Sequence, residues 1–166
     1  MRMTLHTDYA LRMLIFLAVR NGRPCTVSDV ASAYGLSRNH LIKVAQGLSE
    51  LGLVETLRGR AGGIRLARLP EEINVGFVVR AMEDDTALVE CLKTEGGACV
   101  ITASCRLTGI VREALAAYLC VFDKYLLCDL VRNREALATL LGIANPSEDG
   151  MARGEAGSLA AAHEGG

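Results

Sequence analysis

The sequence of 166 residues predicts a mainly α-helical fold, a winged helix-turn-helix with a two-stranded β wing, followed by a cysteine-containing loop and a long helix. Three observations support this prediction. Two short helical segments are joined by a glycine, two strand-like runs flank a glycine-rich tip, and apolar residues recur at helical spacing over 105–125. We expect the winged helix-turn-helix over 1–70, a linker helix and loop over 71–104, dimerisation helices over 105–144 and a disordered tail over 145–166.

Helical periodicity places three helices in the first part of the chain. The first is expected over 8–20 with Thr7 as its N-cap, and the second begins after a Thr26 cap. Gly35 ends the second helix, because a tight turn needs a positive φ that glycine adopts easily. Ser37 is the predicted N-cap of the third helix. The residues that should fill the angle between the second and third helices are small or apolar: Ala31, Leu36, Leu41 and Val44.

The third helix carries hydrogen-bond donors at its start. In a helix-turn-helix, this end of the second motif helix contacts base edges and phosphates in the major groove. The candidate DNA-binding residues here are Ser37, Arg38, Asn39, His40 and Lys43. The alternative is a polar, solvated face on an ordinary helical hairpin.

The predicted wing adds a second basic feature. Strand-like runs at 54–57 and 64–66 flank a glycine-rich tip, and Arg58, Arg60 and Arg65 surround it. A slim basic ribbon can enter a minor groove, where arginine favours the concentrated negative potential. The alternative is a plain turn with solvated arginines, but the order helix-turn-helix then wing favours DNA binding.

The charge distribution agrees with a DNA-binding half. Residues 1–70 contain ten Lys/Arg and four Asp/Glu, a net +6, whereas the rest contains eight and fifteen, a net −7. The sequence has neither a signal-peptide pattern nor an apolar run long enough to span a bilayer, which indicates a cytoplasmic protein with no membrane partner. We find no nucleophile–base pair and no phosphate-binding loop, so an enzyme is not expected.

Six cysteines occur in the chain, and in a reducing compartment they are thiols or metal ligands before they are disulfides. Cys91, Cys99 and Cys105 lie in one irregular segment with the spacing Cys-x7-Cys-x5-Cys, which can surround a soft metal centre. Unconnected thiols are the alternative, and a fourth ligand would have to be a nitrogen, an oxygen or a small molecule. Cys120 and Cys128 are expected to pack in the core, and Cys25 has no evident partner; these three are not assigned a role.

The helix expected over 105–125 carries a long apolar stripe. The chain offers no helix of equal length to cover it, so pairing with its copy in a second subunit would bury the stripe. Packing back on its own domain is the alternative. A homodimer also matches the way helix-turn-helix proteins bind palindromic double-stranded operators.

Three motifs together resemble a family of winged-helix iron–sulfur transcriptional regulators, and within it the branch of nitric-oxide-sensing repressors. The resemblance covers about residues 1–142. The motifs are Thr7-Asp8-Tyr9-Ala10-Leu11-Arg12, Leu36-Ser37-Arg38-Asn39-His40-Leu41-Ile42-Lys43-Val44 and Arg58-Gly59-Arg60-Ala61-Gly62-Gly63-Ile64-Arg65-Leu66. The three-cysteine loop completes the pattern.

The resemblance implies a 4Fe–4S cluster held by Cys91, Cys99 and Cys105, with Asp8 of the other subunit as the fourth ligand. It also implies a repressor of nitric-oxide detoxification genes for which nitric oxide is the signal. The related branch that regulates cluster biogenesis has a histidine where this chain has Thr108, so a 2Fe–2S site of that type is not expected. Alternatives are a regulator that senses iron or redox state, a zinc-stabilised DNA-binding protein, and an iron–sulfur electron carrier or enzyme.

Overall fold

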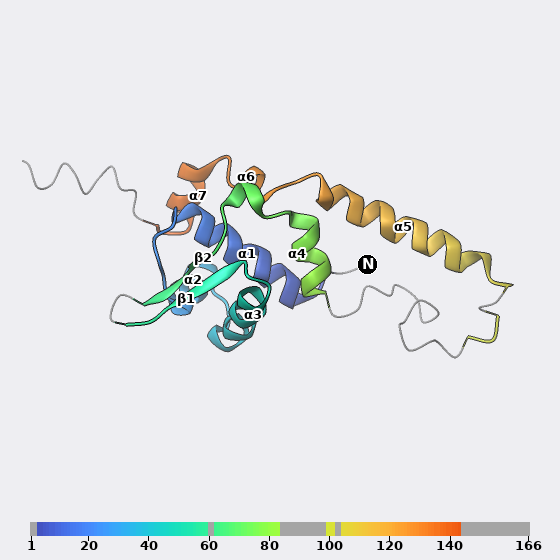
Figure 1. Cartoon of the computed structure of the whole chain (residues 1–166), viewed down its shortest axis with the longest axis horizontal. Coiled ribbons are helices and arrows are strands. Elements are labelled where there is room, and N and C mark those ends of the chain that lie inside the picture. The colour runs from blue at the N-terminus through green and yellow to red at the C-terminus, as the bar shows by residue number, and fades with distance from the viewer. Residues whose placement is uncertain (1–2, 60–61, 84–98, 102–103, 144–166) are drawn as a thin grey trace, which may run out of the picture.

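The first helix, α1 (Leu5–Val19), runs through the centre of the molecule in this computed structural model, which describes residues 3–59, 62–83, 99–101 and 104–143 (Figure 1). Apolar side chains are buried on most sides of α1, because α3, α4, α6 and the hairpin all pack around it. Its N-cap is Thr4 rather than the expected Thr7: the Thr4 hydroxyl accepts a hydrogen bond from the Thr7 N–H at 3.2 Å, and Thr7 itself is fully buried.

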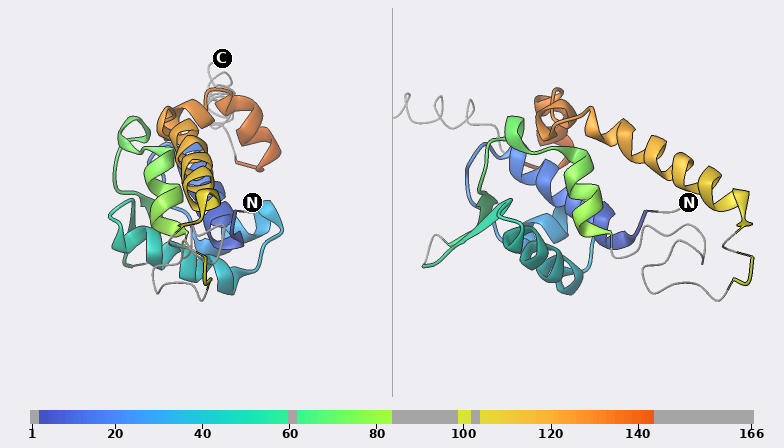
Figure 2. Two further views of the ribbon diagram at one scale, coloured as in Figure 1. Left: turned by 90° about the vertical axis from the view of Figure 1, so that its right-hand side faces the viewer. Right: turned by 45° about the vertical axis from the view of Figure 1, so that its right-hand side comes forward.

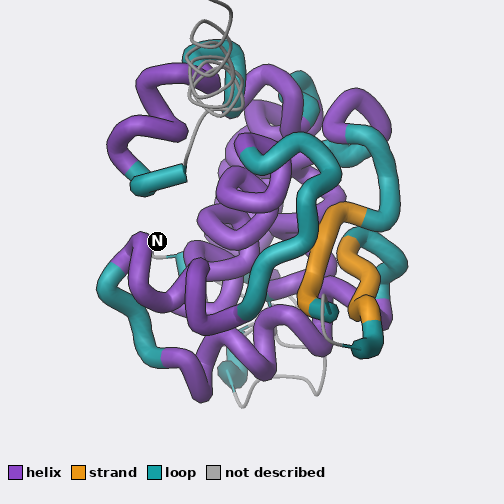
Figure 3. The backbone as a smooth tube through the Cα atoms, turned by 90° about the vertical axis from the view of Figure 1, so that its left-hand side faces the viewer, coloured by secondary structure: helices purple, strands orange, loops and turns teal. Residues whose placement is uncertain are grey.

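The predicted winged helix-turn-helix is confirmed. Helices α2 (Val27–Tyr34) and α3 (Arg38–Glu50) are followed by the antiparallel strands β1 (Val54–Leu57) and β2 (Gly63–Leu66). Figure 3 shows this hairpin at the edge of the helical body. A further bridge between Cys25 and Ile64 attaches the hairpin to the start of the helix-turn-helix. The wing is therefore held in a fixed place beside α2 and α3.

The next segment joins this body to a projecting helix. A short 3-10 helix, η1 (Pro70–Glu72), precedes α4 (Val75–Met82), which corresponds to the linker helix expected within 71–104. Helix α5 (Arg106–Asp123) packs against α4. Figures 1 and 2 show α5 projecting from the body with its first turn at the outer end. None of its residues is buried in the single chain. In the part of the chain that the structure describes, no helix has the length and apolar character needed to cross a bilayer.

The second of the helices expected within 105–144, which the sequence places at about 129–141, is instead two short helices, α6 (Leu127–Leu130) and α7 (Arg134–Leu140). Both pack on α1, and Leu127 and Ala138 are buried in the common core. The Arg134 guanidinium donates from Nε and Nη2 to the Val19 carbonyl oxygen at 3.0 and 2.7 Å. This bond caps the end of α1, so the last helices belong to the same body as the helix-turn-helix.

Candidate DNA-binding surface and metal-binding loop

The turn between α2 and α3 has the geometry that the sequence predicts. Gly35 adopts φ +63°, a left-handed conformation that costs little only for glycine. Leu41 and Val44 are fully buried and Ala31 is nearly so, which lets α3 cross closely over α2. Thr26 caps α2 with a reciprocal capping box, its hydroxyl accepting from the Asp29 N–H and the Asp29 carboxylate from the Thr26 N–H. The position of α3 is therefore set by tight packing.

Side chains on the outer face of α3 are available to DNA. Asn39, Lys43 and Gln46 are exposed on the side opposite the buried residues Leu41 and Val44. Ile42 lies on the same outer face and is 41% exposed, although it is not among the predicted DNA-binding residues. The signal was available, because an isoleucine directly after Leu41 falls out of register with the buried stripe of the helix. The outer face thus combines polar donors with one branched apolar side chain.

Two of the predicted DNA-binding residues, Arg38 and His40, contact side chains of neighbouring helices. The Arg38 guanidinium donates from Nε to the Ser28 hydroxyl oxygen at 3.0 Å, so it bridges the starts of α2 and α3. His40 lies on the side of α3 that faces α1, with its ring centroid 6.3 Å from that of Tyr9. Ser37 stands at the N-cap position, although its side chain makes no capping hydrogen bond.

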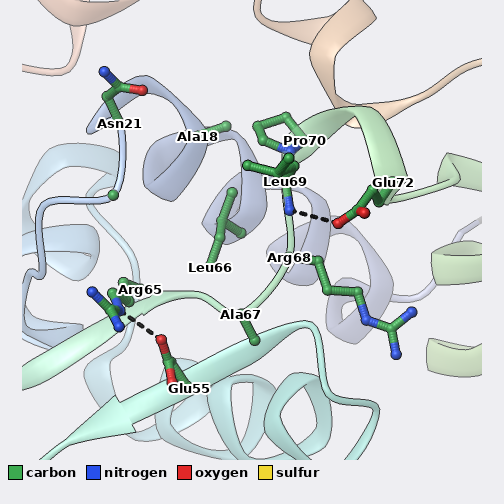
Figure 4. A pocket seen from close by; sticks show the side chains of 11 residues that line it. Ala18, Asn21, Glu55, Arg65, Leu66, Ala67, Arg68, Leu69, Pro70 and Glu72 are labelled. Carbon is green, nitrogen blue, oxygen red and sulfur yellow. Dashed lines mark hydrogen bonds and ion pairs between the residues drawn. The ribbon is translucent and has the colours of Figure 1, made fainter.

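Arg58 and Arg65 of the wing differ in their surroundings. Arg58 is exposed at the start of the tip, whereas Arg60 lies outside the described residues. Arg65 forms an ion pair with Glu55 across the hairpin, with 2.6 Å between Nε and Oε1. Figure 4 shows this pair at a cavity of about 430 Å³ between the base of the hairpin, the end of α1 and η1. Arg58 is therefore better placed than Arg65 to reach a DNA backbone or groove.

The cysteine loop is described in part. Cys91 lies outside the described residues, Cys99 is exposed, and Cys105 is half-buried at the N-cap position of α5. Backbone N–H groups of Thr108 and Leu107 lower the pKa of the Cys105 thiol below its ordinary value. Hydrogen bonds from a helix N-terminus favour the thiolate, which is the form that binds iron. This chemistry fits the predicted iron–sulfur ligand, although the described residues alone contain no cluster of three metal-binding side chains.

The predicted fourth ligand, Asp8, lies in the first turn of α1. Its carboxylate pairs with Arg12, with 2.8 Å between Oδ2 and Arg12 Nη2, and its side chain is 36% exposed. Figures 1 and 2 place the first turn of α5, where Cys105 is, at the outer end of that helix and away from α1. Within one chain, the two parts of the predicted ligand set are separated.

The other three cysteines, Cys25, Cys120 and Cys128, differ in their burial. Cys25 is buried, and burial raises the pKa of its thiol to about 11, so it is a packing residue at neutral pH. Cys128 is half-buried on α6. The prediction that Cys120 packs in the core is wrong for the single chain, because α5 projects from the body and leaves Cys120 exposed.

A helix-turn-helix with an exposed polar face and an adjacent basic wing defines a winged-helix DNA-binding protein. Residues 3–133 match the Rrf2 family, which is described as iron-dependent transcriptional regulator. The chain belongs to this family, and it is a transcriptional regulator rather than an enzyme.

Individual members of the family share about half of their residues with this chain. The chain is 51% identical over 142 residues to the HTH-type transcriptional regulator NsrR of Bacillus subtilis (strain 168), covering 85% of this chain and 97% of that protein. It is 49% identical over 142 residues to the regulator of the same name from Halalkalibacterium halodurans, with the same coverage. Among solved structures, CymR (YrzC), the global cysteine regulator of B. subtilis, matches with a TM-score of 0.59 and 29% identity over 78% of this chain and 95% of that one. The chain is thus an NsrR-type regulator of the Rrf2 family.

Proposed function

We propose that this regulator is a homodimeric repressor of nitric-oxide detoxification genes whose DNA binding depends on a 4Fe–4S cluster. Cys91, Cys99 and Cys105 of one subunit and Asp8 of the other would hold the cluster. The observation that carries the proposal is the identity of about half of the residues to NsrR proteins along nearly their whole length. A regulator of transcription acts on the chromosome, which supports the cytoplasmic location expected from the sequence.

The arrangement of α1 and α5 supports ligation across two subunits. Because Cys105 is the N-cap of α5 and the start of α5 projects away from α1 of the same chain, we assign the oxygen ligand to Asp8 of a second chain. When bound, the cluster would supply iron that reacts with nitric oxide. Asp8 would be the one hard carboxylate ligand beside three soft thiolates, and so the most weakly matched residue of the proposed set. In a protein without the cluster, Asp8 would keep its pair with Arg12, and the link between one subunit's loop and the other's α1 would be absent.

Exposed apolar side chains on α5 support the dimer. Leu107, Ile110 and Val121 are 55%, 62% and 51% exposed in the single chain. Such a stripe on one long helix is typical of a protein–protein contact. Sedimentation equilibrium should give a dimer for the natural chain, and Ile110→Asp should shift it toward monomer. Glu113→Ala, at another exposed position of α5, is the matched control.

The test of sensing is the visible absorption of protein purified without oxygen, before and after nitric oxide is added. A broad band near roughly 400 nm that collapses on addition is expected for a thiolate-bound iron–sulfur sensor. Operator binding, followed in the same samples, should be lost together with the band. A coloured protein that is indifferent to nitric oxide would indicate an iron or redox sensor, and a colourless zinc protein would contradict the cluster.

A further inference from the structure

A small apolar cavity lies between the N-terminal part of α1 and the recognition helix α3. Its volume is about 230 Å³, and its lining is almost entirely apolar surface. The lining residues are Leu5, His6, Tyr9, His40, Lys43 and Val44. Small-molecule sites are usually larger, about 300–1,000 Å³, so the size of this cavity suits one or two aliphatic side chains.

The chain carries an exposed apolar pair that fits such a cavity. Val100 and Ile101 are 97% and 62% exposed, and they directly follow Cys99. Figures 1 and 2 place this segment beyond the outer end of α5, away from α1 and α3 of the same chain. Leaving two branched apolar side chains in water is unfavourable, and burial against a second chain would remove that cost.

The proposed ligand set brings the pair and the cavity together across two subunits. Asp8 is adjacent to Tyr9 and three residues from Leu5, about 4.5 Å along the helix axis. Val100 and Ile101 lie within two residues of Cys99, at most about 7.6 Å of extended chain. If Cys99 and the partner's Asp8 hold one cluster, Val100 and Ile101 reach the mouth of the partner's cavity.

We propose that the segment Val100–Ile101 of one subunit docks in the cavity between α1 and α3 of its partner. This proposal rests on the proposed function, because it requires a dimer with a shared cluster. The docked side chains would contact Val44 and Lys43, and so would fix how α3 sits against α1. Loss of the Asp8 ligand would release the segment and remove this support from the recognition helix. The contact would therefore couple the metal-binding loop of one subunit to the DNA-binding surface of the other.

The main experiment uses a Val100→Ser, Ile101→Ser double variant of the full chain, loaded with its cluster without oxygen. Leu140→Ser is the matched control, because Leu140 is an 81% exposed leucine on α7 that lies outside the cavity. Cluster absorbance and dimer formation are measured first. Hydrogen exchange of the amides at 5–9 and 40–44 and the operator dissociation constant are measured next, in loaded and cluster-free protein.

We expect the double variant to keep its cluster and its dimer. Amide exchange over 5–9 and 40–44 should rise to the level of cluster-free natural protein, and operator affinity should fall about tenfold, as for the loss of partly buried apolar side chains. The Leu140→Ser control should match the natural chain. Unchanged exchange and affinity in a coloured, dimeric double variant would overturn the docking and leave the proposed function intact. A colourless natural protein would overturn the proposed function instead.

A double-mutant cycle covers the case in which the serine variant loses its cluster. Leu5→Ala and Ile101→Ala are milder changes at two exposed positions, one on each side of the proposed contact. Their effects on operator affinity should be less than additive in loaded protein and additive in cluster-free protein, because contacting side chains share one interaction. Additive effects in both states would contradict the contact. If an added small apolar compound slows amide exchange around the cavity where the natural segment does not, that result would identify a different occupant. It would also contradict docking of Val100–Ile101.

Discussion

Gly76 on α4 packs so closely against Asp123 at the end of α5 that a Cβ atom at position 76 would overlap the Asp123 carboxylate. Arg80, one turn further along α4, donates to both carboxylate oxygens, from Nη1 to Oδ1 at 2.5 Å and from Nη2 to Oδ2 at 2.6 Å. Asn74 Nδ2 donates to the Asp123 carbonyl oxygen at 2.9 Å. These contacts fix the direction in which α5 leaves the body, and so fix where Cys105 at the start of α5 lies.

Gly76→Ala should destabilise the protein, although alanine is ordinarily the better helix former. The added methyl group must displace Asp123, and forced overpacking of this kind costs about 1–3 kcal/mol. Gly109→Ala is the matched control, because a Cβ there meets nothing within 4 Å and should stabilise α5 by about 0.5–1 kcal/mol. Urea unfolding of both variants measures the difference. A gain in stability at both positions would show that α4 and α5 are not in close contact.

The stability contributed by Asp123 should depend on pH. The hydrogen bonds from Arg80 lower the pKa of the Asp123 carboxyl below its ordinary value of 3.8. A carboxyl whose pKa is lower in the folded protein stabilises the fold above its unfolded pKa, and this stabilisation is lost as the pH falls through the folded pKa. The natural chain should therefore exceed Asp123→Asn in stability at neutral pH.

The difference between these two proteins is the quantity to measure, because Asp129 also has a lowered pKa and contributes its own acid dependence. Urea unfolding at several pH values between neutral and acid should show a constant difference that shrinks below about pH 3.8. A difference that does not change with pH would assign the effect of Asp123→Asn to packing alone.

The sequence predicted the helix-turn-helix and the wing because their signals are local. A glycine at the turn, an apolar period of three to four residues and a glycine-rich tip each restrict the backbone within a few residues. The N-cap of α1 was missed because Thr4 and Thr7 are both suitable caps, and burial of Thr7 in the core decides between them. Local pattern gives no information on such a choice.

Other features depend on contacts between distant segments. The ion pair between Arg80 and Asp123 joins residues 43 positions apart in the sequence, and no spacing rule predicts it. Likewise, α6 and α7 separate where Arg134 reaches the end of α1. For the proposed cluster site, spacing alone indicated the three cysteines, whereas Asp8 entered only through resemblance to known regulators. A ligand contributed by another subunit, as proposed for Asp8, would leave no pattern within one sequence.

Arg58→Ala should weaken operator binding more than Arg65→Ala. Arg58 is exposed at the tip, whereas Arg65 is already paired with Glu55. The loss of one phosphate or minor-groove contact should lower the salt dependence of binding by about one unit of slope. Dissociation constants at several salt concentrations, on an operator selected from random duplexes, measure both effects. Equal losses for the two variants would mean that the pair between Arg65 and Glu55 opens on DNA.

Ile42 should contribute to sequence recognition through a thymine. It is 41% exposed on the outer face of α3, between Asn39 and Gln46, and an apolar side chain in the major groove can contact the thymine methyl group. Replacing each operator thymine in turn by uracil removes only that methyl. At the contacted position, the natural chain should lose about fourfold in affinity, as for one buried methyl worth ~0.8 kcal/mol. Ile42→Ala should be insensitive to the same replacement, while Gln46→Ala should keep the natural sensitivity. If no uracil position distinguishes the natural chain from Ile42→Ala, Ile42 does not read a thymine.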